Sequence, residues 1–296
     1  MAEGGGANLD LWVTETHQEH MGLSFKVEET LFSGRSDFQK VDVVRTAGHG
    51  VLLLNDGIMM VSERDEFVYH EMIAHVPLFV HPDPRRVLII GGGDGGTARE
   101  VLRHPSVERA TLVEIDGMVV NACREHMPSV HGGAFDDPRL ELRIQDGVKY
   151  VAETEERFDV VLVDSTDPIG PAAPLFDRTF YGNVVRRLTD RGIFVSQAES
   201  PFYDGRIQRP MFENQREFFA RLHLYLFTNL TYPGGLWSFG FASKGLCPLA
   251  DFDPARVAAA GLSTRWYNPG VHRAAFGLPT FVADRLAGTL DPLPEP

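Results

Sequence analysis

The stretch RVLII-GGGDGG-TAREVLRH, residues 86–104, followed by TLVEID at 111–116, decides the fold of this chain. Its first run is short, apolar and β-branched, which predicts a strand buried on both faces of a parallel sheet. The turn that follows has the spacing G-x-G-x-x-G at Gly91, Gly93 and Gly96. Glycine there permits positive φ and lets a ligand touch the backbone at the start of a helix. A second strand then ends in Glu114, about 20 residues on, where a carboxylate can hold ribose hydroxyls, so the stretch predicts a nucleoside site in an α/β fold.

Asp94 distinguishes this glycine loop from loops that bind dinucleotides. A pyrophosphate needs the loop N–H groups and the helix dipole without a competing anion, so a carboxylate inside the loop argues against NAD. The same carboxylate favours a cationic ligand. The alternative is that Asp94 only caps the following helix, as Asp often does.

Composition narrows the class of protein. A chain of 296 residues with 43% hydrophobic content can bury a large core, as one α/β domain or one domain with a small appendage. The net charge of −13 argues against nucleic acid or an anionic membrane as a partner and suits a cationic small molecule, although solubility alone would also explain it. The two cysteines, Cys123 and Cys247, are too few for a disulfide framework and are expected to be free thiols. With no signal-peptide pattern and no apolar run of the ~20 residues that a membrane span needs, we expect a cytoplasmic protein.

The pattern of the N-terminal part predicts β-hairpins. Residues 11–62 alternate short apolar runs with turn residues, most clearly at Asn55-Asp56-Gly57. From Glu66 to Val80 the hydrophobic period lengthens to that of a helix, which Pro82 and Pro84 then end. We therefore expect two domains: an N-terminal β-hairpin domain, residues 1–65, and a Rossmann-like domain, residues 66–296.

Strands and helices alternate through the catalytic part. The pattern predicts strands at 140–144, 158–163 and 192–198, helices at 118–127, 175–188 and 211–222, and a closing antiparallel hairpin at 222–230 and 236–244.

Acids recur where ligands bind in such sheets, beyond the carboxyl ends of the strands. One acid is explained as a helix cap, but four successive acids predict a site: Asp94, Glu114, Asp146 and Asp164.

Seven motifs, in their order and spacing, make the chain resemble spermidine synthases of the polyamine aminopropyltransferase family. They cover nearly the entire chain: ERDEFVYHEM (63–72), GGGDGG (91–96), VEID (113–116), QDG (145–147), DSTDPIGP (164–171), TYPGG (231–235) and YNPGVHRAAF (267–276). The resemblance implies a Rossmann-like catalytic domain of the class I methyltransferase type, residues 66–296, with a small N-terminal β domain. It also implies that the N-terminal domain serves oligomerisation, as a homodimer or homotetramer, and forms a wall of the acceptor site.

The resemblance also implies a reaction and a set of site residues. The implied enzyme moves the aminopropyl group of decarboxylated S-adenosylmethionine to putrescine, giving spermidine and 5'-methylthioadenosine. It needs no metal and no cofactor, since the decarboxylated donor is a co-substrate. Asp164 is the implied catalytic base. The implied donor-binding residues are Gln39, Gly91, Gly93, Asp94, Gly96, Glu114, Asp146, Gly147 and Pro171, and the implied acceptor-binding residues are Tyr69, His70, Asp94, Asp164, Asp167 and Tyr232.

This chemistry calls for carboxylates. Both substrates are cations, and an amine with a pKa near ~10 must lose a proton before its lone pair can attack the carbon next to the sulfonium. Simpler interpretations remain for some residues: packing for Tyr69 and His70 on an amphipathic helix, core positions for Trp12 and Tyr232, and a turn at Asp167 before Pro168.

Two features depart from the commonest family pattern. His70 stands where animal members carry glutamine and bacterial ones often histidine, which suggests a bacterial type. Thr97 and Ala98 replace bulkier apolar residues, and we expect no effect of either on the chemistry of the loop.

Rival functions stay open at this stage. The same chemistry could act on agmatine, cadaverine or spermidine, or the chain could be a putrescine N-methyltransferase, although Asp94 would repel the α-carboxylate of that enzyme's donor. A silent polyamine-binding protein could keep the fold without the activity. Asp94 also disfavours a dehydrogenase.

Overall fold

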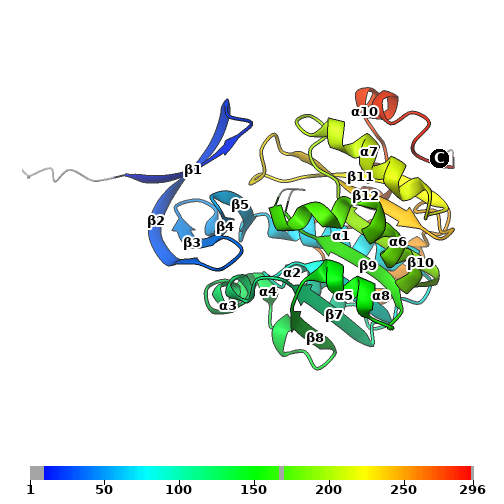
Figure 1. Ribbon diagram of the computed structural model, residues 1–296, viewed down its shortest axis with the longest axis horizontal. Coiled ribbons are helices and arrows are strands. Elements are labelled where there is room, and N and C mark those ends of the chain that lie inside the picture. Colours follow the sequence, from blue (N-terminus) through cyan, green and yellow to red (C-terminus); the bar gives the residue numbers. More distant parts are fainter. Residues whose placement is uncertain (1–9, 167–169, 295–296) are drawn as a thin grey trace, which may run out of the picture.

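A computed structural model describes residues 10–166 and 170–294 (Figure 1). Two sheets organise these residues: an N-terminal sheet in the order β1-β2-β3-β4-β5, and a larger sheet in the order β11-β12-β10-β9-β6-β7-β8. Figure 1 shows the N-terminal sheet, in blue, to one side of the larger sheet and its helices.

The N-terminal sheet is an antiparallel meander, which confirms the predicted hairpins. Asp56 and Gly57 both have positive φ, 49° and 85°, as a tight hairpin turn between β4 and β5 requires. Trp12 is 58% exposed on the edge strand β1, so its interpretation as a core residue is wrong. The strands are β1 Leu11–His17, β2 Met21–Arg35, β3 Lys40–Thr46, β4 Gly50–Asn55 and β5 Ile58–Ser62.

The larger sheet has a parallel core, in which the order of strands reverses beside β6. The strands β6 to β10 run parallel, whereas β12 is antiparallel to both of its neighbours. This arrangement confirms the predicted Rossmann-like fold of the methyltransferase type. Its strands are β6 Arg86–Gly91, β7 Arg109–Glu114, β8 Leu140–Ile144, β9 Phe158–Asp164, β10 Leu188–Gln197, β11 Arg221–Thr228 and β12 Leu236–Ser243.

Helices cover this sheet and its approaches. The described α-helices are α1 Glu66–Val80, α2 Gly96–Leu102, α3 Gly117–His126, α4 Pro128–His131, α5 Gly147–Glu153, α6 Arg178–Arg187, α7 Gly205–Arg216, α8 Pro254–Ala260, α9 Pro269–Ala275 and α10 Thr280–Arg285. Two short 3-10 helices are η1 Ala134–Asp136 and η2 Gly170–Phe176.

Two predicted helices have different bounds in the structure. The helix predicted at 175–188 begins only after η2, where Asp177 caps α6 by accepting the N–H of Phe180 at 2.8 Å. The predicted bounds 211–222 are wrong: α7 begins at Gly205, contains Pro210 and ends at Arg216. Burial of Met211 and Phe212 against the sheet holds this helix in spite of the proline.

Alternation along the strands builds two cores, one on each face of the larger sheet. On β6, Val87 and Ile89 pack towards α1 and α2, while Leu88 and Ile90 pack towards α5, α6 and α7. A third core joins the N-terminal sheet to α3, with Val41 and Leu53 among its members. The N-terminal sheet is therefore held against the larger part, at the edge where the candidate site lies. Its status as a separate domain, with a boundary at residue 65, stays a prediction.

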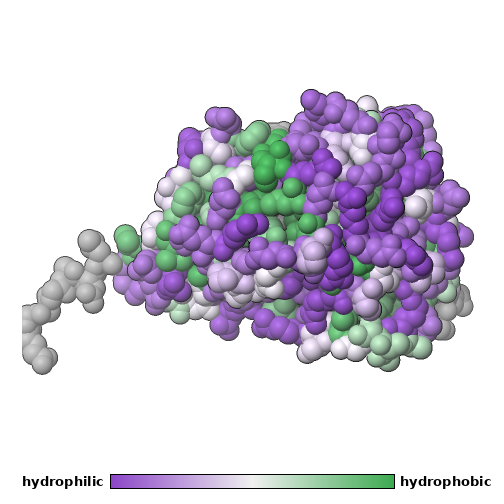
Figure 2. Space-filling model, turned by 90° about the horizontal axis from the view of Figure 1, so that it is seen from below, coloured by the Kyte–Doolittle hydropathy of each residue, from purple (hydrophilic) through white to green (hydrophobic). Residues whose placement is uncertain are grey.

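The described surface is mainly polar in the view from below, with hydrophobic residues gathered over a limited area (Figure 2). None of the helices in the described ranges is long and apolar enough to cross a membrane. Cys123 and Cys247 are free thiols, as predicted.

Candidate active site

The glycine loop lies directly against the end of β9. Gly91 and Gly92 have φ of 81° and 68°, and the N–H of Gly92 donates to the carbonyl of Asp164 at 2.8 Å. A Cβ on Gly91 would lie 2.0 Å from that carbonyl oxygen. Glycine is needed here because the two strand ends approach this closely.

Gly96 allows α1 to approach the start of α2. A Cβ on Gly96 would lie 2.2 Å from the ring of His70, so any larger residue would displace this histidine. Gly93 faces Glu114 in the same way: a Cβ on Gly93 would lie 3.0 Å from Glu114 Oε2.

One cavity beyond the carboxyl ends of β6, β7 and β9 brings most of the predicted residues together. The predicted residues on its lining are Gln39, Tyr69, His70, Gly91, Gly93, Asp94, Glu114, Asp146, Gly147, Asp164 and Tyr232. Gly96 supports the site from behind, as described above. Pro171 falls in η2, and Asp167 lies outside the described residues.

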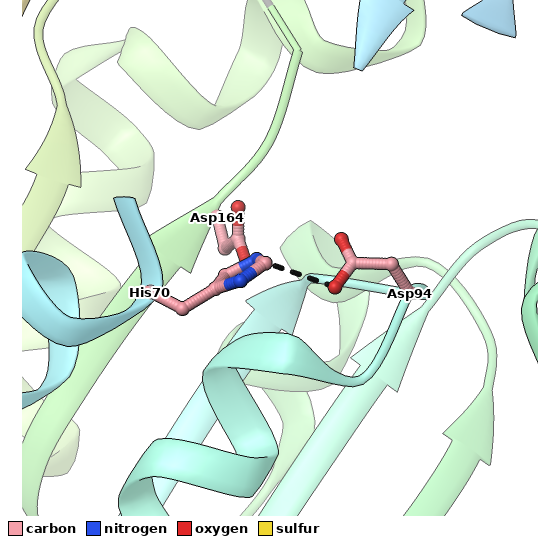
Figure 3. Close-up of side chains that lie close together, drawn as sticks. All are labelled: His70, Asp94 and Asp164. Carbon is pink, nitrogen blue, oxygen red and sulfur yellow. Dashed lines mark ion pairs between the residues drawn. The ribbon is translucent and has the colours of Figure 1, made fainter. Parts of the chain in front are cut away.

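His70, Asp94 and Asp164 form the centre of this cavity (Figure 3). One polar atom of each lies within 4.8 Å of the others. The His70 Nε2 is 3.3 Å from Asp94 Oδ1, and its Nδ1 is 2.6 Å from Glu66 Oε2. Burial alone would lower the pKa of His70, but Asp94 and Glu66 outweigh it and raise that pKa to about 10.

The charged His70 decides what the centre can bind. An imidazolium has a proton on both nitrogens and no lone pair for a metal ion. The protonated trio keeps two carboxylates beside one imidazolium, an arrangement that can bind an organic cation and transfer a proton.

Asp94 both caps a helix and faces the cavity. Its Oδ1 accepts the N–H of Gly96, the first residue of α2, at 2.7 Å, so Asp94 satisfies a donor at the helix start from the position before the N-cap residue, Gly95. Burial would raise the pKa of Asp94, but His70, the Gly96 N–H and Arg99 lower it overall. Asp94 is thus an ionised carboxylate on the cavity wall, with 13% of its side chain exposed.

The pKa of Asp164 is shifted in the opposite direction to that of Asp94. Burial and the neighbouring Asp94 raise its pKa to about 6, against the lowering effect of His70 and of hydrogen bonds from Thr97 and Tyr69. The hydroxyl of Thr97 donates to Asp164 Oδ2 at 2.7 Å. Thr97 thus contacts the end of β9, and our expectation that it has no effect on the chemistry of the loop stays a prediction. A carboxylate with a pKa near neutrality can accept a proton and release it again.

Glu114 is buried at the end of β7. Burial is the main cause that raises its pKa to about 7, although the N–H groups of Asp116 and Gly93 oppose the rise. The Asp116 N–H donates to Glu114 Oε1 at 2.9 Å. Its other oxygen faces Gly93, where a ligand can approach the loop.

Gln39 and Asp146 border the nucleoside end of the cavity. The Gln39 amide donates to Asp116 Oδ2 at 3.1 Å, which fixes its loop to the start of α3. Asp146 is exposed and caps α5, where its Oδ1 accepts the N–H of Val148 at 2.8 Å. Their ligand contacts stay predictions.

Aromatic side chains line the other end. The ring of Tyr69 lies 6.1 Å from that of Tyr232 and 4.9 Å from that of Phe239. The Tyr232 hydroxyl donates to the carbonyl of Met60 at 2.7 Å. Asp65, just before α1, accepts the backbone N–H groups of residues 230 and 231, which holds the Tyr232 loop next to Tyr69.

The sequence reasoning missed several lining residues: Glu15, His17, Met59, Met60, Gln197 and Trp237. Gln197 ends β10, so the rule applied to acids at strand ends would have found it had amides been counted. Glu15 and His17 give no local signal, because only the packing of the N-terminal sheet brings β1 to the cavity.

The sheet order and the polar groups at its strand ends define a transferase-type Rossmann-like fold. Residues 66–254 match the family described as the spermine/spermidine synthase domain, and residues 11–63 match the spermidine synthase tetramerisation domain.

Similar relatives are curated as polyamine aminopropyltransferases. The protein from Desulforudis audaxviator is 48% identical over 280 residues, covering 94% of this chain and 99% of the relative. The one from Bacillus subtilis is 44% identical over 275 residues, covering 93% and 98%.

Solved structures of spermidine synthases are also similar to this chain. A spermidine synthase in complex with the transition state analogue AdoDATO has a TM-score of 0.92 at 43% identity, covering 97% of this chain and 98% of that one. The spermidine synthase from Thermotoga maritima has a TM-score of 0.90 at 43% identity, covering 97% of each chain. The chain therefore belongs to the spermine/spermidine synthase family of polyamine aminopropyltransferases, and it is a transferase.

Proposed function

We propose that this enzyme transfers the aminopropyl group of decarboxylated S-adenosylmethionine to putrescine, producing spermidine and 5'-methylthioadenosine. The observation that carries the proposal is the pair Asp94 and Asp164: an ionised carboxylate inside the glycine loop, next to a second carboxylate whose pKa is about 6. The first suits a cationic donor, and the second suits a base.

Each end of the cavity has a role in this proposal. Glu114 holds the ribose, Asp146 and Gly147 contact the adenine, and Gln39 and Pro171 help to bind the nucleoside. Asp94 binds the terminal ammonium of the donor. Tyr69, His70 and Tyr232 line the acceptor path. Asp167, outside the described residues, is assigned an acceptor-binding role by the family resemblance alone.

In the reaction, the amine nitrogen of putrescine attacks the aminopropyl carbon next to the sulfonium. The new C–N bond forms as the C–S bond breaks, its electron pair stays on sulfur, and Asp164 takes the proton of the amine. Holding nitrogen and carbon in line supplies much of the acceleration, because the sulfonium is already a good leaving group. The proposed chemistry uses no metal or further cofactor.

A product assay tests this assignment. The enzyme is given decarboxylated S-adenosylmethionine with putrescine, cadaverine, agmatine and spermidine, singly and in competition, and products are read by mass. We expect spermidine and 5'-methylthioadenosine to dominate. A preference for another amine would assign that acceptor instead, and N-methylputrescine from intact S-adenosylmethionine would assign a methyltransferase. Putrescine binding without any product would indicate a silent binding protein.

We also propose that the enzyme is a homodimer or homotetramer assembled through the N-terminal sheet. Leu11 and Trp12 are 62% and 58% exposed on β1, an edge strand with unpaired backbone groups. The tetramerisation family that residues 11–63 match supports the proposal. Sedimentation at micromolar concentration should show a dimer or tetramer, and Trp12→Glu should weaken it. A wild-type monomer would contradict the proposal.

A further inference from the structure

Thr97 is the first side chain of α2 after the glycine loop, and it is fully buried. Its hydroxyl donates to Asp164 Oδ2 at 2.7 Å, a distance typical of a hydrogen bond to an ionised oxygen. This contact joins α2 to the end of β9. The glycine loop makes a second link between the same two elements, from the Gly92 N–H to the carbonyl of Asp164.

We infer that Thr97 is a positioning residue for Asp164: its hydroxyl holds one carboxylate oxygen at the back of the cavity, which fixes the orientation of the candidate base. The inference rests on the proposed function, in which Asp164 takes the proton of the attacking amine. Thr97 itself does not line the cavity, so it acts through Asp164 and makes no contact with substrate.

The surroundings of Asp164 explain why a positioning contact matters. Two further carboxylates, Asp94 and Glu114, interact with it unfavourably, while His70 and Tyr69 attract it. A carboxylate among such neighbours has several possible partners. The Thr97 hydroxyl selects one orientation and, because it donates to the charged form, also favours ionisation.

Two substitutions separate the hydroxyl from the shape of the residue. Thr97→Val keeps the branched side chain and its volume but removes the donor. Thr97→Ser keeps the donor and removes a methyl group. A packing role would make the serine variant the more damaged of the two in thermal stability, whereas a positioning role would spare it in turnover.

The experiment is a pH–rate profile of wild type and both variants with saturating donor and putrescine. We expect Thr97→Val to lower kcat by about 10-fold and to move the acid limb of the profile upward by about one pH unit, the effect of losing a hydrogen bond to a carboxylate. KM for donor should change by less than about 3-fold, since Thr97 is not on the lining of the cavity. Thr97→Ser should restore both kcat and the acid limb. A valine variant with an unmoved limb, or a serine variant as impaired as valine, would overturn the inference.

A second readout does not depend on activity. The carboxyl carbon of Asp164 is titrated by NMR in ligand-free protein labelled with ¹³C at aspartate, with its signal assigned from Asp164→Asn. The apparent pKa should rise in Thr97→Val and return in Thr97→Ser. If wild type titrates as expected but transfers no aminopropyl group, the proposed function fails while the contact stands. If the valine variant titrates like wild type, the inference itself fails.

Discussion

Helix α1 carries two histidines that each face a carboxylate from the segment after β6, and the two regions differ in purpose. At the cavity, His70 faces Asp94 and lies beside Asp164. Deeper in the protein, His75 Nε2 lies 3.0 Å from Glu100 Oε2 and its Nδ1 lies 2.9 Å from His104 Nε2.

Asp164 and Glu114 at the cavity have electrostatics opposite to those of Glu100, whereas Asp94, which faces His70, resembles Glu100 in its lowered pKa. Burial would raise the pKa of Glu100, but His75, Arg99 and Arg103 outweigh it and hold that pKa well below its ordinary value. At the cavity, burial prevails and raises the pKa of Asp164 and Glu114. In the deep cluster, the histidine and the arginines neutralise Glu100 within the fold. The cavity keeps an excess of carboxylates, whose negative charge a cationic substrate can neutralise. This difference separates a functional group of residues from a structural one.

The largest effect is expected from Asp164→Asn. Loss of the base should reduce turnover by roughly 10²–10⁴-fold while donor affinity changes little. Stopped assays give turnover, and calorimetry with decarboxylated S-adenosylmethionine gives affinity. Asp177→Asn is the matched control: it makes the same substitution at the cap of α6, where asparagine also caps well. Collapse of donor affinity with turnover per bound complex intact would make Asp164 a binding residue.

Glu100→Gln should affect the other region. Removing one charge from a buried, paired cluster costs about 3 kcal/mol of unfolding free energy, because His75 and the arginines lose their partner. Turnover per folded molecule should stay within about two-fold. Denaturant unfolding beside an activity assay checks both. A loss of turnover without a loss of stability would contradict the structural role assigned to the deep cluster.

The comparison also shows what a sequence can reveal. The glycine spacing and the acids at strand ends located Asp94, Glu114, Asp146 and Asp164, because strand ends of a parallel sheet meet at one edge. The deep cluster gave no signal, since its residues come from α1, α2 and the turn after α2, with no motif of their own. Thr97 was dismissed because its neighbour in space, Asp164, lies 67 positions away in sequence. Glu15 and His17 depend on how one sheet packs on another, which local patterns do not encode.

Asp94→Asn tests whether the charge in the glycine loop selects the donor. A charge-assisted hydrogen bond between Asp94 and the donor ammonium is worth ~1.5–3 kcal/mol, and the carboxylate of intact S-adenosylmethionine would lose a comparable amount. Wild type should therefore prefer the decarboxylated donor by on the order of 10²-fold or more. The variant should narrow this gap mainly by binding the preferred donor less tightly.

Competition binding with both donors on wild type and Asp94→Asn measures the ratio. Glu213→Gln, an exposed substitution on α7, controls for net charge. Equal affinities in wild type, or a ratio that the substitution leaves unchanged, would reduce Asp94 to a helix cap and reopen the methyltransferase alternative.

The smallest effect concerns the stability of the ligand-free protein and the unbalanced charge at Glu114. The pKa of Glu114 is about 7 in the folded protein and 4.5 in the unfolded chain, so between these values the folded state binds more protons. Ionisation of Glu114 therefore lowers the unfolding free energy as pH rises from 4.5 to about 7, and the loss is complete above that.

Glu114→Gln does not titrate, so the variant should be more stable than wild type at pH 8, by on the order of 2 kcal/mol, and equal to it below pH 4.5. Urea unfolding at several pH values and one protein concentration gives the difference, which also contains the shift that Asp164 undergoes when the neighbouring Glu114 charge is removed. Under the proposed role of Glu114 in holding the ribose, the same variant should also bind donor less tightly. A stability difference that is constant with pH, or that shrinks as pH rises, would mean that the fold already compensates Glu114 as fully as it compensates Glu100.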